Sequence, residues 1–156
     1  MGELKENWDF GIEESKEFDI GYATGHDLKE FDKNILIKAG LLVSKDGKQT
    51  REFFSHRIIF AYRKNGEIVY LIGSRTEHEK LNSKGEVKSK YIKLPTGTNN
   101  PHVSKFISNQ YFYSEDSIKD ADYIIITEGI TDVISAIKNG YATLSPVPLQ
   151  KLQKNM

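Results

Sequence analysis

The fold class is decided by one stretch of sequence, YIIITEGITDV, at residues 123–133. Its first five residues form an unbroken run of aromatic and β-branched side chains, which is typical of a strand buried on both faces of a parallel sheet. The apolar residues that follow repeat with the spacing of one helix face: Ile130, Val133, Ile134 and Ile137. A second short strand is expected at residues 141–144, after a helix stop at Gly140. The pattern predicts a strand–helix–strand unit.

Upstream of this unit, the sequence is typical of an antiparallel sheet. Two dipeptides, Asp46-Gly47 and Asn65-Gly66, separate apolar runs, and each favours a tight hairpin turn because glycine and asparagine accept a positive φ. The polar residues 76–89 predict a loop with a short hairpin at Lys84-Gly85. SKYIKLP, at residues 89–95, predicts a further strand.

Helices are expected before and after this sheet. One is predicted over residues 12–18. A second is predicted from Asp27, which resembles a capping box with Glu30, to a stop at Gly40. Its apolar face is predicted to consist of Leu28, Phe31, Ile35 and Leu36. A third helix, or pair of helical turns, is predicted over residues 103–119.

The predicted fold class is therefore α+β. Residues 1–105 are expected to form a mixed antiparallel-sheet subdomain with helices, and residues 106–156 a partial α/β unit. A chain of 156 residues with 38% apolar side chains can form a real core, and no apolar run is long enough to cross a bilayer. The absence of cysteine excludes a disulfide scaffold and a thiolate zinc site. The N-terminus lacks the apolar core of a secretory signal, so a cytoplasmic protein is expected.

The neutral net charge hides an uneven distribution. Residues 45–105 hold 13 basic and 6 acidic residues, a net charge of +7, whereas residues 1–44 and 106–156 carry −5 and −2. A solvated surface can have this composition. Clustered lysine and arginine are also what binding to nucleic-acid phosphates requires, so the middle segment is a candidate binding surface.

A candidate acidic site follows the strand at residues 123–127. Glu128 lies in the turn between this strand and the following helix, Gly129 permits close approach of a ligand, and Asp132 lies in the first helical turn. Two carboxylates across such a turn are suitable ligands for Mg²⁺, which prefers oxygen. The spacing is equally compatible with an Asp132 that only complements the helix dipole and a Glu128 that is an ordinary surface acid.

These segments resemble a known family. EGITDV preceded by YIIIT resembles the first motif of the TOPRIM domain, which is found in topoisomerases, primases and related nucleases. IGYATG, then AGLLVSKDGKQTREFFSHRIIFAYRKNGEIVYLIGSR, then SKYIKLP resemble, in the same order, the catalytic core of bacterial-type (DnaG-like) DNA primases. The resemblance spans residues 10–147, nearly the whole chain.

The resemblance implies roles for individual residues. Glu128 would be the catalytic TOPRIM acid near the metal ions, with Asp132 as its metal-binding companion. The positions that line a basic groove for template DNA and primer are matched by Arg57, Arg75, Lys90 and Tyr91, with Lys93 and Lys105 as weaker candidates. Each of the basic residues can also be an ordinary strand-edge charge, and Tyr91 is more typical of a partly buried core residue.

The resemblance also implies a function for a larger parent protein. The parent would synthesise RNA primers from ribonucleoside triphosphates on single-stranded DNA, with Mg²⁺ or Mn²⁺ and a replicative helicase, in the cytoplasm near the nucleoid. No membrane partner is expected. No zinc is expected either, because the four histidines are scattered without ligand spacing and the family's cysteine-rich zinc module is missing: His26, His56, His78 and His102. Ser55-His56 and the long 76–89 loop also depart from the family pattern.

The end of the chain predicts a fragment. No aspartate or glutamate follows Asp132, whereas the family needs a second acidic motif of the Asp-x-Asp type to hold two metals. We expect the isolated chain to make no primers, to bind no metal tightly, and to bind single-stranded DNA weakly. Two alternatives stay open: a non-catalytic nucleic-acid-binding module with a degenerate TOPRIM half, or another TOPRIM enzyme such as a nuclease.

Overall fold

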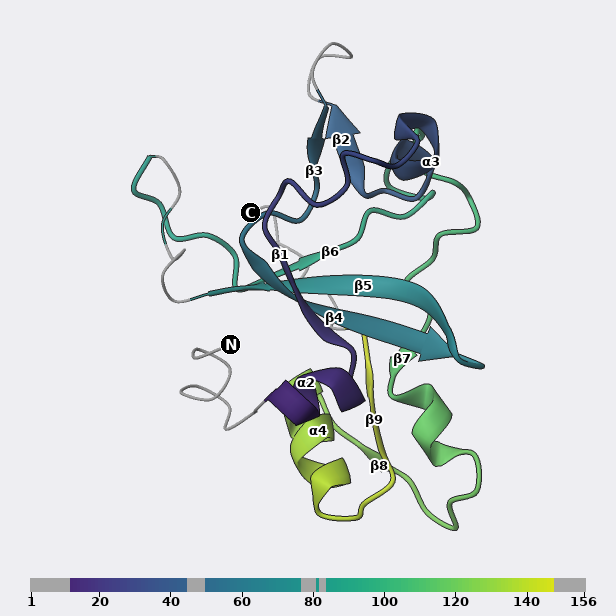
Figure 1. Cartoon of the computed structure of the whole chain (residues 1–156). Coiled ribbons are helices and arrows are strands. Elements are labelled where there is room, and N and C mark those ends of the chain that lie inside the picture. The colour runs from purple at the N-terminus through teal and green to yellow at the C-terminus, as the bar shows by residue number, and fades with distance from the viewer. Residues whose placement is uncertain (1–11, 45–49, 77–80, 82–83, 148–156) are drawn as a thin grey trace, which may run out of the picture.

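A four-stranded antiparallel sheet of order β1-β4-β5-β6 forms the centre of the computed structural model, which describes residues 12–44, 50–76, 81 and 84–147 (Figure 1). Its strands are β1 (Ile20–Ala23), β4 (Arg57–Lys64), β5 (Glu67–Arg75) and β6 (Tyr91–Lys93). A second sheet pairs β2 (Leu42–Ser44) with β3 (Thr50–Glu52). A third has the order β7-β9-β8 and contains β7 (Phe112–Tyr113), β8 (Ile125–Ile126) and β9 (Thr143–Pro146). The predicted α+β class with antiparallel sheets is confirmed.

The hairpin between β4 and β5 forms as predicted. Asn65 and Gly66 have φ values of 53° and 81°, the two positive values that a type I′ turn requires. The short hairpin at Lys84-Gly85 is also present, since Gly85 has a φ of 77° and Leu81 bridges Val87. Asp46-Gly47 lies outside the described residues, although β2 and β3 pair antiparallel on either side of it.

The first helix, α2 (Ile12–Glu17), lies where it was predicted. The second prediction was wrong in its start: α3 spans Lys33–Lys38, and its N-cap is Asp32, whose carboxylate accepts from the backbone N–H groups of the first turn. Asp27 instead closes a local turn by accepting from the backbone and hydroxyl of Thr24, at 2.7 and 2.8 Å. Only Leu36 of the predicted apolar face is buried, while the side chains of Phe31 and Ile35 are exposed.

The helix predicted over residues 103–119 was wrong. The described segment forms turns, the short strand β7 and a single 3₁₀ turn, η1 (Glu115–Ile118). Serine and asparagine side chains explain the difference, because they bond nearby backbone N–H groups and so compete with a helix. Ser104 Oγ accepts from the N–H of Phe106 at 3.3 Å, and Ser108 Oγ accepts from Gln110 at 3.1 Å.

The predicted strand–helix–strand unit is confirmed. β8 pairs parallel with β9, and α4 (Ile130–Lys138) connects them, with Ile130, Val133 and Ile134 buried. The expectation that the first strand is buried on both faces was wrong: β8 contains two residues, and the side chain of Ile126 is 68% exposed. β8 is the outer strand of its sheet and has β9 as its one partner there, so it lacks the neighbours that bury a central parallel strand.

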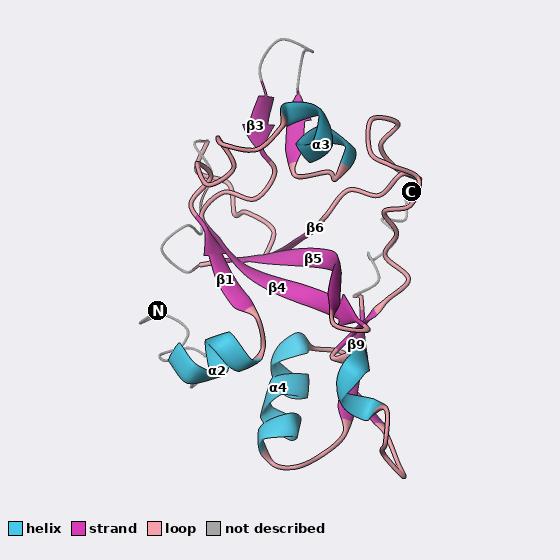
Figure 2. Ribbon diagram, turned by 45° about the vertical axis from the view of Figure 1, so that its right-hand side comes forward, coloured by secondary structure: helices cyan, strands magenta, loops and turns pink. Residues whose placement is uncertain are grey.

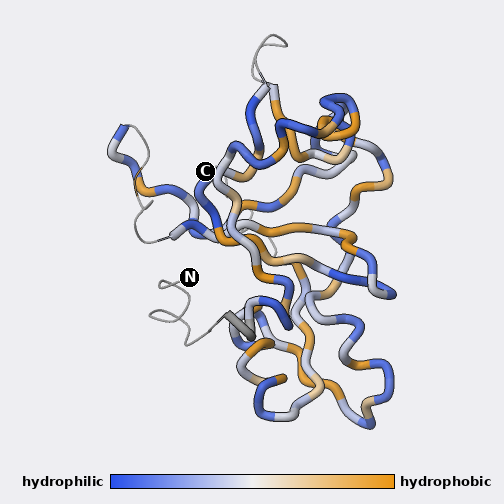
Figure 3. Tube along the Cα trace, in the orientation of Figure 1, coloured by the Kyte–Doolittle hydropathy of each residue, from blue (hydrophilic) through white to orange (hydrophobic). Residues whose placement is uncertain are grey.

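One hydrophobic cluster joins the two parts that the sequence separates at residue 105. Phe60 and Ile72 of the central sheet belong to the same cluster as Tyr113, Val133 and Ile134 from the C-terminal part. Figures 1 and 2 show the β2–β3 hairpin and α3 on one side of the central sheet and α2, α4 and β9 on the other. Apolar residues concentrate along the central strands and α4 in Figure 3. No helix in the described ranges is long and apolar enough to span a membrane.

Candidate nucleic-acid interface

The acidic turn lies between β8 and α4, as the sequence predicts. Glu128 is exposed, and Gly129 is the N-cap residue of α4 in an extended conformation. A Cβ at position 129 would lie 2.7 Å from Oδ2 of Asp132, so the glycine leaves the space that the carboxylate fills. The requirement for glycine is therefore close approach, not a special φ, and the Asp132 carboxylate folds back over the turn that carries Glu128.

Tyr91, in β6 of the central sheet, lies within electrostatic range of this turn. Burial raises the pKa of the Tyr91 hydroxyl, and the negative charge of Asp132 raises it further. The Nζ of Lys90 lies 5.4 Å from the centroid of the Tyr91 ring. The structure thus brings Lys90, Tyr91 and Asp132, which are 42 residues apart at most, into one electrostatic neighbourhood.

Arg57 is held inside the fold and is only 7% exposed. Its Nη1 donates to the carbonyl oxygens of Ser89 and Lys90 at 3.1 and 3.2 Å, and more weakly to Gly73 at 3.4 Å. These bonds fasten β4 to the segment that leads into β6. Arg57 therefore has a structural task, and its predicted contact with DNA stays a prediction.

Arg75 lies opposite Arg57 in the β4–β5 pairing. Its side-chain Nε donates to the Lys88 carbonyl at 3.1 Å, and its backbone N–H donates to the Lys90 carbonyl at 2.7 Å. Desolvation lowers the pKa of Arg57, and the positive charge of Arg75 lowers it further. The two guanidinium groups therefore concentrate positive charge beside the start of β6.

A cavity of about 720 Å³ opens beside Tyr91 and Lys93. Partial burial lowers the pKa of the Lys93 ammonium group. The cavity is also lined by three polar amides that the sequence reasoning missed: Asn99, Asn109 and Gln110. No motif marks them: Asn109 and Gln110 enter from the segment that was wrongly predicted as a helix, and Asn99 enters from the loop before it. Charge and hydrogen-bonding groups thus meet in one concave site.

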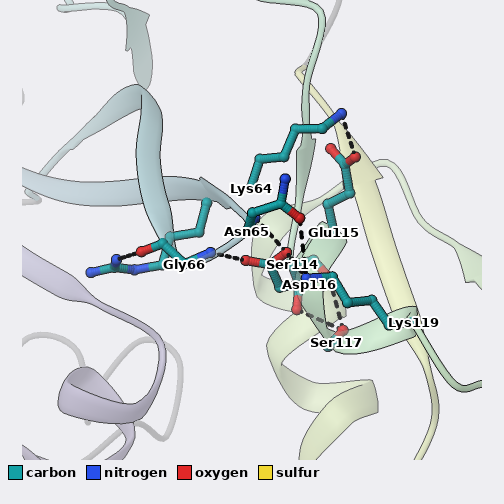
Figure 4. A network of polar contacts seen from close by, with 9 residues as sticks. Lys64, Asn65, Gly66, Ser114, Glu115, Asp116, Ser117 and Lys119 are labelled. Carbon is teal, nitrogen blue, oxygen red and sulfur yellow. Dashed lines mark hydrogen bonds and ion pairs between the residues drawn. The ribbon is translucent and has the colours of Figure 1, made fainter.

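A polar network holds the β4–β5 turn against the C-terminal part (Figure 4). The carboxylate of Asp116 accepts from the backbone N–H groups of Asn65 and Gly66, both at 2.8 Å, and pairs with Lys119 at 3.1 Å. The backbone donors, Gly66 first, lower the pKa of Asp116 to about 2. Nothing in the sequence indicated this contact, which joins residues about 50 positions apart.

Metal binding is limited to what one turn offers. Glu128 and Asp132 can supply two of the oxygen ligands of Mg²⁺, which commonly keeps several waters and binds through one or two carboxylates. Among the described residues, no group of three or more histidine, cysteine, aspartate or glutamate side chains is arranged to hold a metal. These two carboxylates are the acidic oxygen ligands that the turn offers, and a metal ion here would need further oxygen ligands from elsewhere.

Several solved structures share this fold. A DnaG primase catalytic domain bound to ssDNA is 21% identical with a TM-score of 0.69, and the match covers 95% of this chain and 48% of that one. A DNA primase domain from Pseudomonas aeruginosa is 21% identical with a TM-score of 0.73, covering 96% and 47%. The RNA polymerase domain of Mycobacterium tuberculosis DnaG, in complex with a double-stranded DNA oligomer with a 6-nucleotide overhang, is 17% identical with a TM-score of 0.75, covering 96% and 47%. The chain spans about half the length of these structures.

Sequence comparison identifies the family. No curated protein matches the sequence significantly. A family model described as the DNA primase catalytic core, N-terminal domain, matches residues 4–119, which is most of the 156-residue chain. The match includes the whole central sheet and the η1 turn. The chain therefore belongs to the family of the DNA primase catalytic core, N-terminal domain.

Proposed function

We propose that this chain is part of a DNA primase, or primase-helicase, and that it binds single-stranded DNA at the start of β6. One observation carries the proposal: the ammonium group of Lys90 lies 5.4 Å from the centroid of the Tyr91 ring, and the Asp132 carboxylate lies near enough to raise the pKa of the Tyr91 hydroxyl. Phosphoryl transfer requires both charges near one another, positive side chains for the phosphates and carboxylates for the metal ions. Arg75, Lys90, Tyr91 and Lys93 would contact the strand, and Arg57 would support them.

The related structures support a nucleic-acid partner. One is a DnaG catalytic domain bound to ssDNA, and two others are DnaG RNA polymerase domains in complex with DNA oligomers. Phosphate contacts supply most of the affinity for such ligands and make it dependent on salt. We therefore propose weak binding that is strongest at low ionic strength.

The acidic turn would be the first motif of a TOPRIM domain. In the full-length parent, Glu128 and Asp132 would help to hold Mg²⁺ or Mn²⁺, which would neutralise triphosphate charge and position the primer end. The parent would join ribonucleotides on a DNA template and work with a replicative helicase. This chain would supply the basic surface and only part of the metal site.

A binding titration tests the proposal. Fluorescence anisotropy of a labelled oligo-dT should rise with added chain, and Lys90→Ala should weaken binding and reduce the slope of log affinity against log salt by about 0.7. Lys138→Ala removes the same charge from the last turn of α4 and serves as the matched control. The binding assignment is abandoned if wild type gives no signal at low salt, or if both variants bind as wild type does.

A second experiment tests whether this chain alone can synthesise a primer. The isolated chain, with template, ribonucleoside triphosphates and Mg²⁺ or Mn²⁺, should extend no primer, because two carboxylates at one turn cannot complete a two-metal site. Template-dependent ribonucleotide incorporation by this chain would contradict that expectation.

A further inference from the structure

Phe106 is an exposed aromatic ring on a constrained loop. Its side chain is 79% exposed, although its neighbours Val103 and Ile107 are buried or partly buried. A single exposed apolar side chain is common and needs no explanation by itself. The surroundings of Phe106, however, provide three independent observations that agree on one ligand.

The first observation is the rigidity of the loop between β6 and β7. Gly97 donates its N–H to the carbonyl of Ile107 at 3.1 Å, and Ser104 donates to the carbonyl of Lys38 at 2.8 Å. A Cβ at position 97 would lie 2.5 Å from the Cα of Lys105, so the two arms of the loop touch. The loop therefore holds Phe106 outward at a fixed place, which limits the entropy lost when a ligand binds.

The second observation is a cation beside the ring. The Nζ of Lys105 lies 5.5 Å from the centroid of Phe106, nearly the same arrangement as Lys90 over Tyr91 at 5.4 Å. Asn99, from the same loop, lines the cavity beside Tyr91. The two lysine–aromatic pairs thus belong to the two segments that border one cavity.

The third observation is the charge of the whole segment. Residues 87–114 contain four lysines and neither aspartate nor glutamate. A segment with positive charge, exposed aromatic rings and no carboxylates of its own suits a polyanion whose bases can stack, which describes single-stranded nucleic acid.

We infer that Phe106 is a stacking platform for an unpaired nucleic-acid base, with Lys105 contacting the adjacent phosphate. The inference rests on the proposed function, because it extends the path of the strand from Lys90 and Tyr91 onto the loop between β6 and β7. It adds a base contact, by Phe106, that no sequence motif indicated. Stacking should contribute affinity that is independent of salt, whereas Lys105 should contribute affinity that depends on salt.

The test compares ligands with and without bases. Labelled oligo-dT and oligo-U of about 12 nucleotides, and an abasic strand of the same length, would be titrated by anisotropy against the 156-residue chain. Phe106→Ala should weaken binding to the base-bearing strands about tenfold without changing the salt slope, and should leave abasic binding unchanged. Phe106→Tyr should retain wild-type affinity, and Lys105→Ala should reduce the salt slope by about 0.7. Loss on one base-bearing strand alone would assign the contact to that strand.

The control is Ile35→Ala, which removes another exposed apolar side chain, 66% exposed, from α3. Ile35→Ala should bind all three strands as wild type does. Both Ile35→Ala and Phe106→Ala should keep the wild-type melting temperature. Wild-type affinity of Phe106→Ala for oligo-dT, while Lys90→Ala is impaired, overturns the stacking assignment and leaves the proposed function intact. An equal loss on the abasic strand, or a lower oligomeric state of Phe106→Ala than of wild type, also overturns it. A wild-type chain that binds no strand removes the proposed function and the stacking assignment together.

Discussion

Replacing Tyr62 with phenylalanine should stabilise the fold. The Tyr62 side chain is fully buried, and its hydroxyl makes no hydrogen bond within the part of the chain that the structure describes. Leaving a buried polar group unpaired costs about 1–3 kcal/mol, so removing the hydroxyl should raise the free energy of unfolding by about 1 kcal/mol. The ring contacts with Tyr70 and Tyr113, at centroid distances of 5.9 and 5.4 Å, would be retained. For a chain of this size the melting temperature should rise by about 3 °C.

Tyr70→Phe is the matched control with the opposite sign. The Tyr70 hydroxyl donates to the buried carbonyl of Leu94 at 2.6 Å, so its removal leaves that oxygen unpaired and should cost about 1–2 kcal/mol. Urea unfolding followed by far-UV circular dichroism measures both effects, and the m-value should stay constant. A loss of stability in Tyr62→Phe of more than about 0.5 kcal/mol would refute the reasoning, because the hydroxyl must then have a bonding partner such as a buried water.

Three further outcomes are expected. The free energy of unfolding should fall as the pH rises above about 10, because tyrosine ionises there in the unfolded chain, whereas burial raises the pKa of folded Tyr70 to about 12 and keeps its side chain neutral. Below pH 10 Tyr70 is neutral in both states, so it should not change the urea midpoint measured against pH. Asp116→Asn should lower the urea midpoint at neutral pH by weakening the bonds to the β4–β5 turn, whereas Asp120→Asn, at an exposed site, should not; equal midpoints would show that the turn is held without this carboxylate. Arg57→Ala should lower the free energy of unfolding by about 2 kcal/mol because it removes the bonds to three carbonyl groups, and exposed Arg51→Ala should change it little in the same thermal melts.

Local signals in the sequence predicted the elements that local chemistry controls. Asn65-Gly66 forms its turn because both residues accept a positive φ, and this needs no information from elsewhere in the chain. The spacing of apolar residues predicted α4, because a helix that is buried along one face repeats its apolar residues every three or four positions in the sequence. Parallel pairing of β8 and β9 followed from the helix between them.

The sequence-based predictions were wrong where tertiary contacts or short-range side-chain hydrogen bonds compete with the local sequence signals. Asp32 caps α3 in place of Asp27, because Asp27 is already bonded to Thr24. The serine and asparagine bonds between β6 and β7 replace the predicted helix with the loop that carries Phe106. That loop carries the amide groups of Asn99, Asn109 and Gln110 and the exposed ring of Phe106, and none of these could be placed from the sequence.

The geometry of the candidate site depends on the shared core more than on its own contacts. Tyr91 belongs to the central sheet and Asp132 to α4, and both elements pack through one hydrophobic cluster in which Phe60 and Tyr113 meet edge to face at 6.3 Å. Packed cores resist continuous deformation, so a cavity made at this contact should shift α4 relative to β6 as well as lower stability. The distance between β6 and the turn that carries Glu128 is thus set by apolar side chains. This explains why neither the charge pattern nor the acidic motif alone predicts the site.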